Sequence, residues 1–264
     1  MRALLVPLAL VLAAYAAYCA LLFSQQRAMM FPGATMRIAP DEPRPPPGVR
    51  SVRFAGGGEA WFRPPATVPG PIVVFAHGNA ELIDDGEDVL AGCAAHGLGT
   101  LLVEYPGYGR TRGDPSLASL DAAFDAAYDW LAAQPEVDPA RIHALGRSVG
   151  TGVAARLATR RDVAALVLQS PFTRVADFAW RMGVPPWFVR DPYDNLEAVA
   201  RYPGPVLVLH GRRDDVIPFA MGEAVARASP RATLVPMDCA HNDCPDDAAD
   251  YWRTVARFVD AATR

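Results

Sequence analysis

Excess positive charge and lysine are both missing from this chain of 264 residues. The 25 basic residues are all arginines, and 29 Asp and Glu outnumber them, which gives a formal net charge of −4. Nucleic-acid binding depends on a positive field that attracts phosphates, so this balance excludes nucleic acid as a partner. We attribute the use of arginine alone to genomic codon bias and infer no function from it.

Cysteine is scarce, so the sequence indicates no disulfide framework. Cys19 lies in an apolar run and Cys93 in a helical stretch, whereas Cys239 and Cys244 bracket His241. Only this last pair is a candidate for a bridge, which would rigidify the histidine loop in an oxidising compartment. Because spacing does not fix geometry, reduced thiols are the expected state on sequence alone.

Charge is also absent from residues 3–23, a run of 21 residues. A helix of that length measures about 32 Å, enough to cross a bilayer. We expect a retained single-pass membrane anchor, with the following domain on the periplasmic or extracytoplasmic side as a working hypothesis. Arginines flank the run on both sides, so charge does not decide the orientation. Secretion after signal cleavage is the alternative, since Arg2 supplies a positive n-region, although a signal's apolar core usually has about 7–15 residues.

The composition divides the chain into three segments. Residues 1–24 form the anchor or uncleaved signal, residues 25–48 a proline-rich linker, and residues 49–264 one catalytic domain. The linker holds five prolines between positions 40 and 47, which exclude regular helix and central strand. It fits a stiff tether or a loop packed on the domain equally well.

From residue 49 onward, short β-branched or apolar runs alternate with longer helical segments. This alternation predicts an α/β fold, with a mostly parallel eight-stranded sheet and helices on both faces. A stretch at about 172–201 is aromatic and interrupted by prolines, so it predicts a short cap inserted between two strands. The strands are expected at 52–54, 60–63, 72–76, 100–104, 142–145, 165–168, 206–209 and 233–236, and the helices at 82–96, 117–133, 149–159, 220–228 and 248–261.

Residues 146–150 read Gly-Arg-Ser-Val-Gly and match G-x-S-x-G between a predicted strand and a predicted helix. That context favours a nucleophile elbow, in which small flanking residues allow a tight turn and the backbone exposes the Ser148 hydroxyl. A glycine turn with an N-capping serine would explain the five residues alone. The predicted strand before these residues and the predicted helix after them favour the nucleophile elbow.

A serine hydroxyl needs a base and an orienting carboxylate, which in this fold follow in the order Ser, acid, His. Asp214 follows the strand at 206–209, at the carboxyl end where open α/β sheets build sites. Asp215 is its rival, because adjacent loop residues point in different directions. His241 follows the last predicted strand and is the base candidate, since His96, His143 and His210 are explained by helix-end, strand or packing positions.

The third requirement is a pair of donors for the oxyanion formed when serine attacks a carbonyl. His77-Gly78-Asn79 follows the strand at 72–76 and offers the backbone N–H of Asn79 beside that of Val149. Taken alone, His-Gly at a strand end would be only a turn.

With these pieces in order, the chain resembles the α/β-hydrolase superfamily, and within it a membrane-tethered serine hydrolase subgroup. The resemblance rests on FAHGNA at 75–80, EYPGYG at 104–109, LGRSVG at 145–150, HGRRDDVIP at 210–218 and HND at 241–243. Its acid-loop spacing to Ile217 and Pro218 favours Asp214. A span followed by Gln26-Arg27 and Phe31-Pro32 is also similar to tethered members, whereas Cys239-Ala240 departs from the glycine that often precedes the histidine.

The resemblance implies a serine esterase, lipase or acyl-thioesterase that needs no metal or organic cofactor. Aromatic side chains of the cap, namely Phe172, Phe178, Trp187 and Phe188, are expected to line an acyl pocket or form the core of the cap. The expected partners are a small or lipid-like acyl substrate and the membrane, and the oligomeric state stays open. A peptidase-like hydrolase and a non-catalytic tethered binding module are the alternatives. Dehalogenases and epoxide hydrolases of this fold need Asp where Ser148 stands.

Overall fold

The structure is a computed structural model that describes residues 2–36, 38, 45–54 and 57–262. Its described part contains an eight-stranded sheet with the order β1-β2-β4-β3-β5-β6-β7-β8. β2 runs antiparallel to both β1 and β4, and every other neighbouring pair is parallel. The strands are β1 (Arg50–Arg53), β2 (Glu59–Arg63), β3 (Gly70–Ala76), β4 (Gly99–Val103), β5 (Val137–Arg147), β6 (Leu166–Gln169), β7 (Val206–Gly211) and β8 (Ala232–Met237).

The central strands are buried on both faces, which explains their nearly continuous apolar sequences. Every residue of β3, β6 and β7 is buried. Parallel sheets have this property because helices cover both of their faces. The expected fold class, a mostly parallel eight-stranded sheet between helices, is confirmed.

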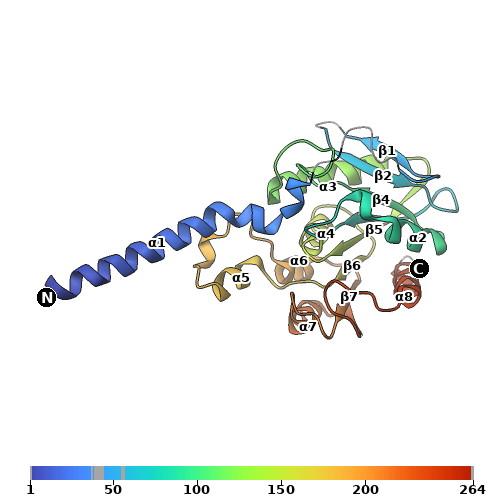
Figure 1. Ribbon diagram of the computed structural model, residues 1–264. Helices are drawn as coiled ribbons and strands as arrows, with labels where there is room; N and C mark the ends of the chain where they lie inside the picture. Colours follow the sequence, from blue (N-terminus) through green and yellow to red (C-terminus); the bar gives the residue numbers. More distant parts are fainter. Residues whose placement is uncertain (1, 37, 39–44, 55–56, 263–264) are drawn as a thin grey trace.

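Two layers of helices cover the sheet (Figure 1). One apolar core lies under α2 (Glu87–Ala95) and α8 (Ala248–Ala262) and includes Leu90 and Trp252. The other includes Phe124, Val153 and Val225. It lies under α3 (Leu117–Ala132), α4 (Gly150–Ala158), α6 (Asn195–Arg201) and α7 (Phe219–Arg227). The helix expected at 82–96 is divided, because the 3₁₀ turn η2 (Ile83–Asp85) precedes Gly86 and α2.

The insertion expected at 172–201 contains α5 (Val175–Arg181), the 3₁₀ turn η3 (Pro186–Phe188) and α6. We call residues 175–191 the cap, because α6 packs on α4 within the helical layer. The cap lies beside the amino-terminal helix α1 rather than over the sheet (Figure 1).

α1 (Arg2–Met30) projects from the domain as one long helix (Figure 1). Its segment Leu5–Met30 is long and apolar enough to cross a membrane, a property that signal sequences share. The helix continues six residues past the boundary expected at position 24, and η1 (Pro32–Thr35) follows it. Phe31 is fully buried, so the chain docks on the domain directly after α1. Residues 39–44, with two of the five linker prolines, lie outside the described residues.

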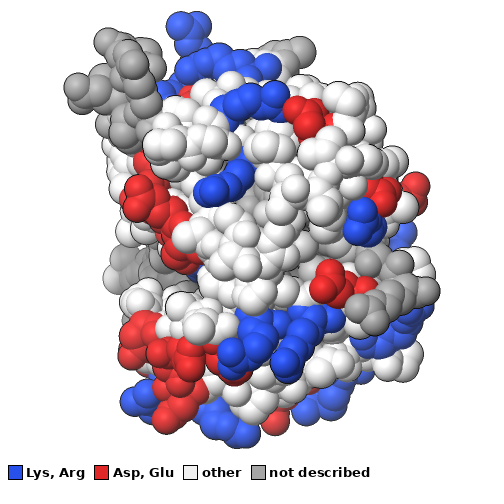
Figure 2. Space-filling view, turned by 90° about the vertical axis from the view of Figure 1, so that its right-hand side faces the viewer, with Lys and Arg blue, Asp and Glu red and all other residues white. Residues whose placement is uncertain are grey.

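Figure 2 shows the side of the molecule remote from α1. Arginine and acidic side chains both appear there around an uncharged central area. Mixed charge of this kind is typical of a surface that faces water. α1 differs, because Leu5, Leu8, Val11 and Leu12 are each more than half exposed.

Candidate active site

Ser148 occupies a strained turn between β5 and α4. Its φ is +55°, a left-handed conformation that non-glycine residues rarely adopt. The flanking glycines are required by space, because a Cβ on Gly146 would lie 2.3 Å from the Gly150 carbonyl oxygen and one on Gly150 would lie 2.1 Å from that of Ala76. The sharp turn expected from G-x-S-x-G is therefore present, and it packs against the end of β3.

His241 approaches Ser148 from the loop after β8. Its Nε2 lies 3.0 Å from Ser148 Oγ, within hydrogen-bond distance. Cys239 and Cys244 form a disulfide with a Cα–Cα distance of 5.2 Å, so the expectation of reduced thiols is wrong for this structure. Their Cα spacing is within the usual range for a bridge, which sequence spacing alone did not establish. The bridge closes the short loop that carries His241.

Asp214 lies on the other side of His241, and its Oδ2 is 2.8 Å from His241 Nδ1. Its Oδ1 accepts hydrogen bonds from the backbone N–H groups of Val216 and Ile217 at 3.0 and 2.7 Å. Burial opposes ionisation of Asp214, but hydrogen bonds from His210, His241 and Ile217 outweigh it and lower the pKa of this carboxyl well below its usual range. Asp215 is exposed. The structure therefore places Asp214, rather than its rival, against the histidine.

His210 is a member of the site that sequence reasoning explained only by packing. The side chain is completely buried, and its Nε2 lies 2.8 Å from the Ile217 carbonyl oxygen and 3.4 Å from Asp214 Oδ2. It thus links both ends of the acid loop. Its place four residues before Asp214 in the HGxxD pattern was the available signal.

The segment 77–79 lies beside the elbow, and Asn79 and Val149 line the same cavity as Ser148. The Asn79 carbonyl accepts hydrogen bonds from the Tyr108 hydroxyl at 2.7 Å and from the Gly33 N–H at 3.2 Å. His77 stacks on Tyr105, which donates a 2.6 Å hydrogen bond to the His77 carbonyl. The EYPGYG loop and the chain after α1 therefore hold the oxyanion candidate in place.

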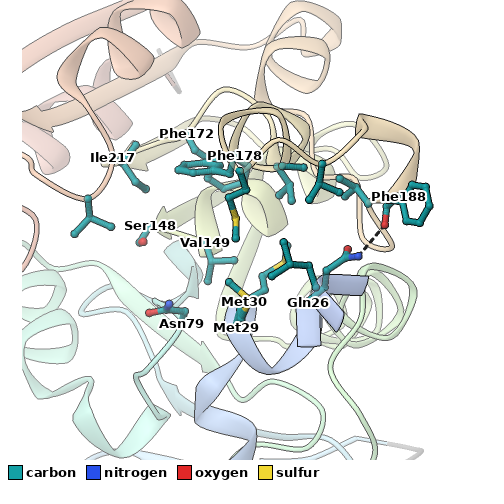
Figure 3. A pocket seen from close by; sticks show the side chains of 17 residues that line it. Gln26, Met29, Met30, Asn79, Ser148, Val149, Phe172, Phe178, Phe188 and Ile217 are labelled. Atoms are coloured by element: carbon teal, nitrogen blue, oxygen red, sulfur yellow. Dashed lines mark hydrogen bonds between the residues drawn. The ribbon is translucent and has the colours of Figure 1, made fainter. Parts of the chain in front are cut away.

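An apolar cavity of about 320 Å³ extends from Ser148 between α1 and the cap (Figure 3). Phe172, Phe178 and Phe188 line it, as expected. The expectation for Trp187 is wrong, because this side chain is 80% exposed and does not line the cavity. Successive side chains of a 3₁₀ turn point about 120° apart. In η3, Phe188 lines the cavity and Trp187 faces outward.

α1 supplies part of the cavity wall, which the sequence did not indicate. Leu22, Gln26, Met29 and Met30 line it opposite the cap (Figure 3). Gln26 Nε2 donates a 2.7 Å hydrogen bond to the Phe188 carbonyl, and its Oε1 accepts one of 2.9 Å from the Arg190 N–H. The spacing of the four lining residues along α1 places their side chains on one helix face. The sequence alone does not indicate which part of the protein that face packs against.

A second cavity, of about 260 Å³, meets the first at Ser148 and Asn79. Its lining is polar and includes Glu81, Arg147 and Ser170, together with His241. Arg147 pairs with Asp88 at 2.7 Å and Glu81 at 3.4 Å. The candidate nucleophile therefore lies between an apolar and a polar compartment.

Comparison with known proteins identifies the family. A family model described as Hydrolase_4, serine aminopeptidase S33, matches residues 67–191, which include Ser148 and end before Asp214. An uncharacterised protein of Mycobacterium tuberculosis is 40% identical over 195 residues, covering 69% of this chain and 67% of that protein. The chain belongs to the α/β-hydrolase superfamily.

This α/β-hydrolase is also 33% identical over 199 residues to human alpha/beta hydrolase domain-containing protein 17C, covering 71% of the chain and 57% of that protein. It thus spans less than two thirds of that animal relative. Among solved structures, an esterase of Pyrococcus furiosus superposes with a TM-score of 0.67 at 17% identity, covering 82% of this chain and 91% of that one. A membrane phospholipase A described as a bacterial virulence factor superposes with a TM-score of 0.64 at 16% identity, covering 99% of each chain.

Proposed function

We propose that this α/β-hydrolase is a membrane-anchored serine hydrolase that cleaves an ester or thioester of an apolar acyl chain. The observation that carries the proposal is the position of Ser148, where an apolar and a polar cavity meet. An acyl chain fits the first cavity and a polar leaving group the second, with the scissile carbonyl at the serine. α1 would be the anchor, since its apolar length is sufficient for a span.

The geometry supports a double-displacement reaction. His241 Nε2 accepts the Ser148 hydroxyl proton as Oγ bonds to the acyl carbon, and the N–H groups of Asn79 and Val149 stabilise the oxyanion. The intermediate collapses by breaking the bond to the leaving oxygen or sulfur, which takes the proton from His241. Water, deprotonated by His241, then attacks the acyl carbon. The bond from that carbon to Ser148 Oγ breaks, Oγ takes the proton back from His241, and the carboxylic acid is released. Asp214 keeps His241 in the required tautomer throughout.

Labelling by a fluorophosphonate probe tests the nucleophile. The full-length protein in detergent micelles should label, whereas a Ser148→Ala variant should not. Ser170→Ala is the matched control, because Ser170 lines the polar cavity, is buried and has a hydroxyl without a hydrogen-bond partner among the described residues, and it should label like the wild type. A folded wild-type protein that fails to label would leave the non-catalytic binding module as the better description.

A substrate panel tests the leaving group and separates the peptidase alternative. p-Nitrophenyl esters and acyl thioesters of increasing chain length should be hydrolysed, with kcat/KM rising until the chain fills the cavity. Aminoacyl p-nitroanilides should be poor substrates, because the cavity beside Ser148 has an apolar lining for the acyl part. Preference for the anilides would replace the esterase proposal with a peptidase.

A further inference from the structure

The cap contacts α1 over a long stretch and through specific polar bonds. The hydroxyls of Tyr15 and Tyr18 donate to the carbonyls of Gly183 and Met182 at 2.7 and 2.9 Å. Further along α1, Arg27 forms a 2.8 Å ion pair with Asp191. The cap is therefore held beside α1 from Tyr15 to Arg27, as the ribbon also shows (Figure 1).

A membrane-spanning α1 would place its contact with the cap at the depth of the bilayer. The hydrocarbon core is about 30 Å thick and takes about 20 helical residues at 1.5 Å each. The part of the uncharged run that precedes Tyr15 covers residues 3–14, which measures only about 18 Å. An α1 that spans the core must also use residues as far as about Leu22. The hydrogen bonds of Tyr15 and Tyr18 then hold the cap loop at 182–183 within the membrane.

The outer surface of the cap suits this depth. Trp180 and Trp187 are 71% and 80% exposed, and Met182 beside them is 39% exposed. Tryptophan is enriched where membrane meets water, because its ring is apolar and its N–H is polar. Arg190 lies over the Phe23 ring at 5.3 Å, at the end of the uncharged run where a headgroup phosphate would be near. The mixed-charge surface in Figure 2 lies on the opposite side of the molecule.

Part of the cavity wall also lies near the membrane surface. Leu22, which lies where a span of this length would leave the hydrocarbon core, lines the cavity together with Met182 of the cap. An acyl chain passing between these two elements would not need to cross water.

We propose that the cap is immersed in the bilayer surface layer and that the cavity takes its acyl chain laterally from the membrane, so that the substrate is a bilayer-resident acyl lipid. The inference on substrate rests on the proposed function, whereas the immersion of the cap does not. The partner of the exposed Trp180 and Trp187 surface is the same bilayer that α1 occupies.

Fluorescence quenching tests immersion. Full-length protein is reconstituted in phosphatidylcholine vesicles whose acyl chains carry bromine, which quenches only tryptophans in contact with lipid. The wild type should be quenched, and a Trp180→Phe/Trp187→Phe variant should lose most of that quenching. Trp130→Phe is the control, because Trp130 packs against Phe54 and Phe62 far from the cap, and quenching should be retained. Equal quenching of the double variant and the wild type would overturn the immersion of the cap.

Hydrolysis tests lateral uptake separately. A Trp180→Glu/Trp187→Glu variant should hydrolyse a soluble p-nitrophenyl butyrate within about twofold of the wild type, because neither tryptophan lines the cavity. Its rate on a long-chain ester embedded in vesicles should fall at least tenfold. Equal loss on both substrates, or on neither, would overturn lateral uptake. If the wild type hydrolyses neither substrate, the proposed function fails, while the quenching result still decides immersion.

Discussion

At the scale of single residues, one carboxylate organises the candidate site. Asp214 offers one oxygen to His241 and the other to two backbone N–H groups, so the acid, the histidine and the acid loop share one set of hydrogen bonds. Charge-assisted bonds of this kind are stronger than neutral ones, and the lowered pKa keeps Asp214 ionised throughout the neutral range. Its neighbour Asp215 is exposed and lacks this role.

Replacing Asp214 therefore tests the assignment of the acid. An Asp214→Asn substitution should lower kcat for ester hydrolysis by about 10³–10⁴-fold, since an amide cannot stabilise the imidazolium and favours the wrong tautomer. Asp215→Asn should change kcat less than about threefold. Steady-state kinetics of both variants on one ester tests which of the two aspartates is the acid. A larger loss for Asp215→Asn would show that the neighbouring residue is the acid.

Tyr108 tests the support of the oxyanion segment. Removing its hydroxyl in Tyr108→Phe deletes the 2.7 Å bond to the Asn79 carbonyl and should lower kcat by about tenfold with little change in KM, because small shifts of a positioned donor are costly. Tyr128→Phe is the control, since it loses an equivalent 2.8 Å bond to the Asp162 carbonyl on another part of the domain. If both variants kept wild-type kcat, Tyr108 would not position Asn79.

At the scale of elements, β5 carries a buried titratable group in addition to the serine. His143 is buried, and neither ring nitrogen has a hydrogen-bond partner among the described residues. Burial, helped by Arg141, lowers the pKa of His143 to about 4. The unfolded chain binds this proton at a higher pH than the folded chain does. Folding stability therefore declines as pH falls from about 6.5 to about 4 and is fully present above that window.

A His143→Leu substitution should remove this contribution. Between pH 7 and pH 4, the free energy of unfolding of the wild type should fall relative to that of the variant by up to about 3 kcal/mol. His96→Leu, at an exposed helix end, should follow the wild type. The measurement is urea unfolding of the full chain in detergent micelles, followed by circular dichroism at each pH. Parallel curves for the wild type and His143→Leu would contradict the pKa shift.

The elements show what the sequence could predict. β3, β6 and β7 were predictable because strands buried on both faces are apolar over nearly their whole length, and Ser148 was predictable because its turn requires two small residues. The orientation of Phe188 inward and Trp187 outward was not, because both are aromatic and the turn η3 decides between them. Residue type alone does not predict which of two neighbouring aromatic side chains points inward.

At the scale of the whole molecule, α1 belongs to two environments. Its first half is exposed and apolar, whereas its last two turns line the cavity and bond to the cap through Gln26 and Arg27. The contact between α1 and residues 175–191 joins segments more than 150 positions apart, so local periodicity carried no sign of it. Hydropathy predicted an anchor, and the fold adds a wall of the candidate substrate site.

Two truncations separate these roles of α1. A chain that begins at Leu22 loses the Tyr15 and Tyr18 hydrogen bonds but keeps the cavity wall and the bonds that Gln26 and Arg27 form with the cap. A chain that begins at Phe31 keeps only the buried docking residue. Both should hydrolyse a soluble two-carbon ester at similar rates, because Ser148, Asp214 and His241 lie in the domain. On a long-chain ester in detergent, the shorter chain should lose about tenfold in kcat/KM, equivalent to the lost burial of about two methylene groups at 0.8 kcal/mol each. Circular dichroism checks that both chains fold. Equal chain-length profiles for two folded truncations would mean that α1 is only an anchor and that the cap alone encloses the acyl chain.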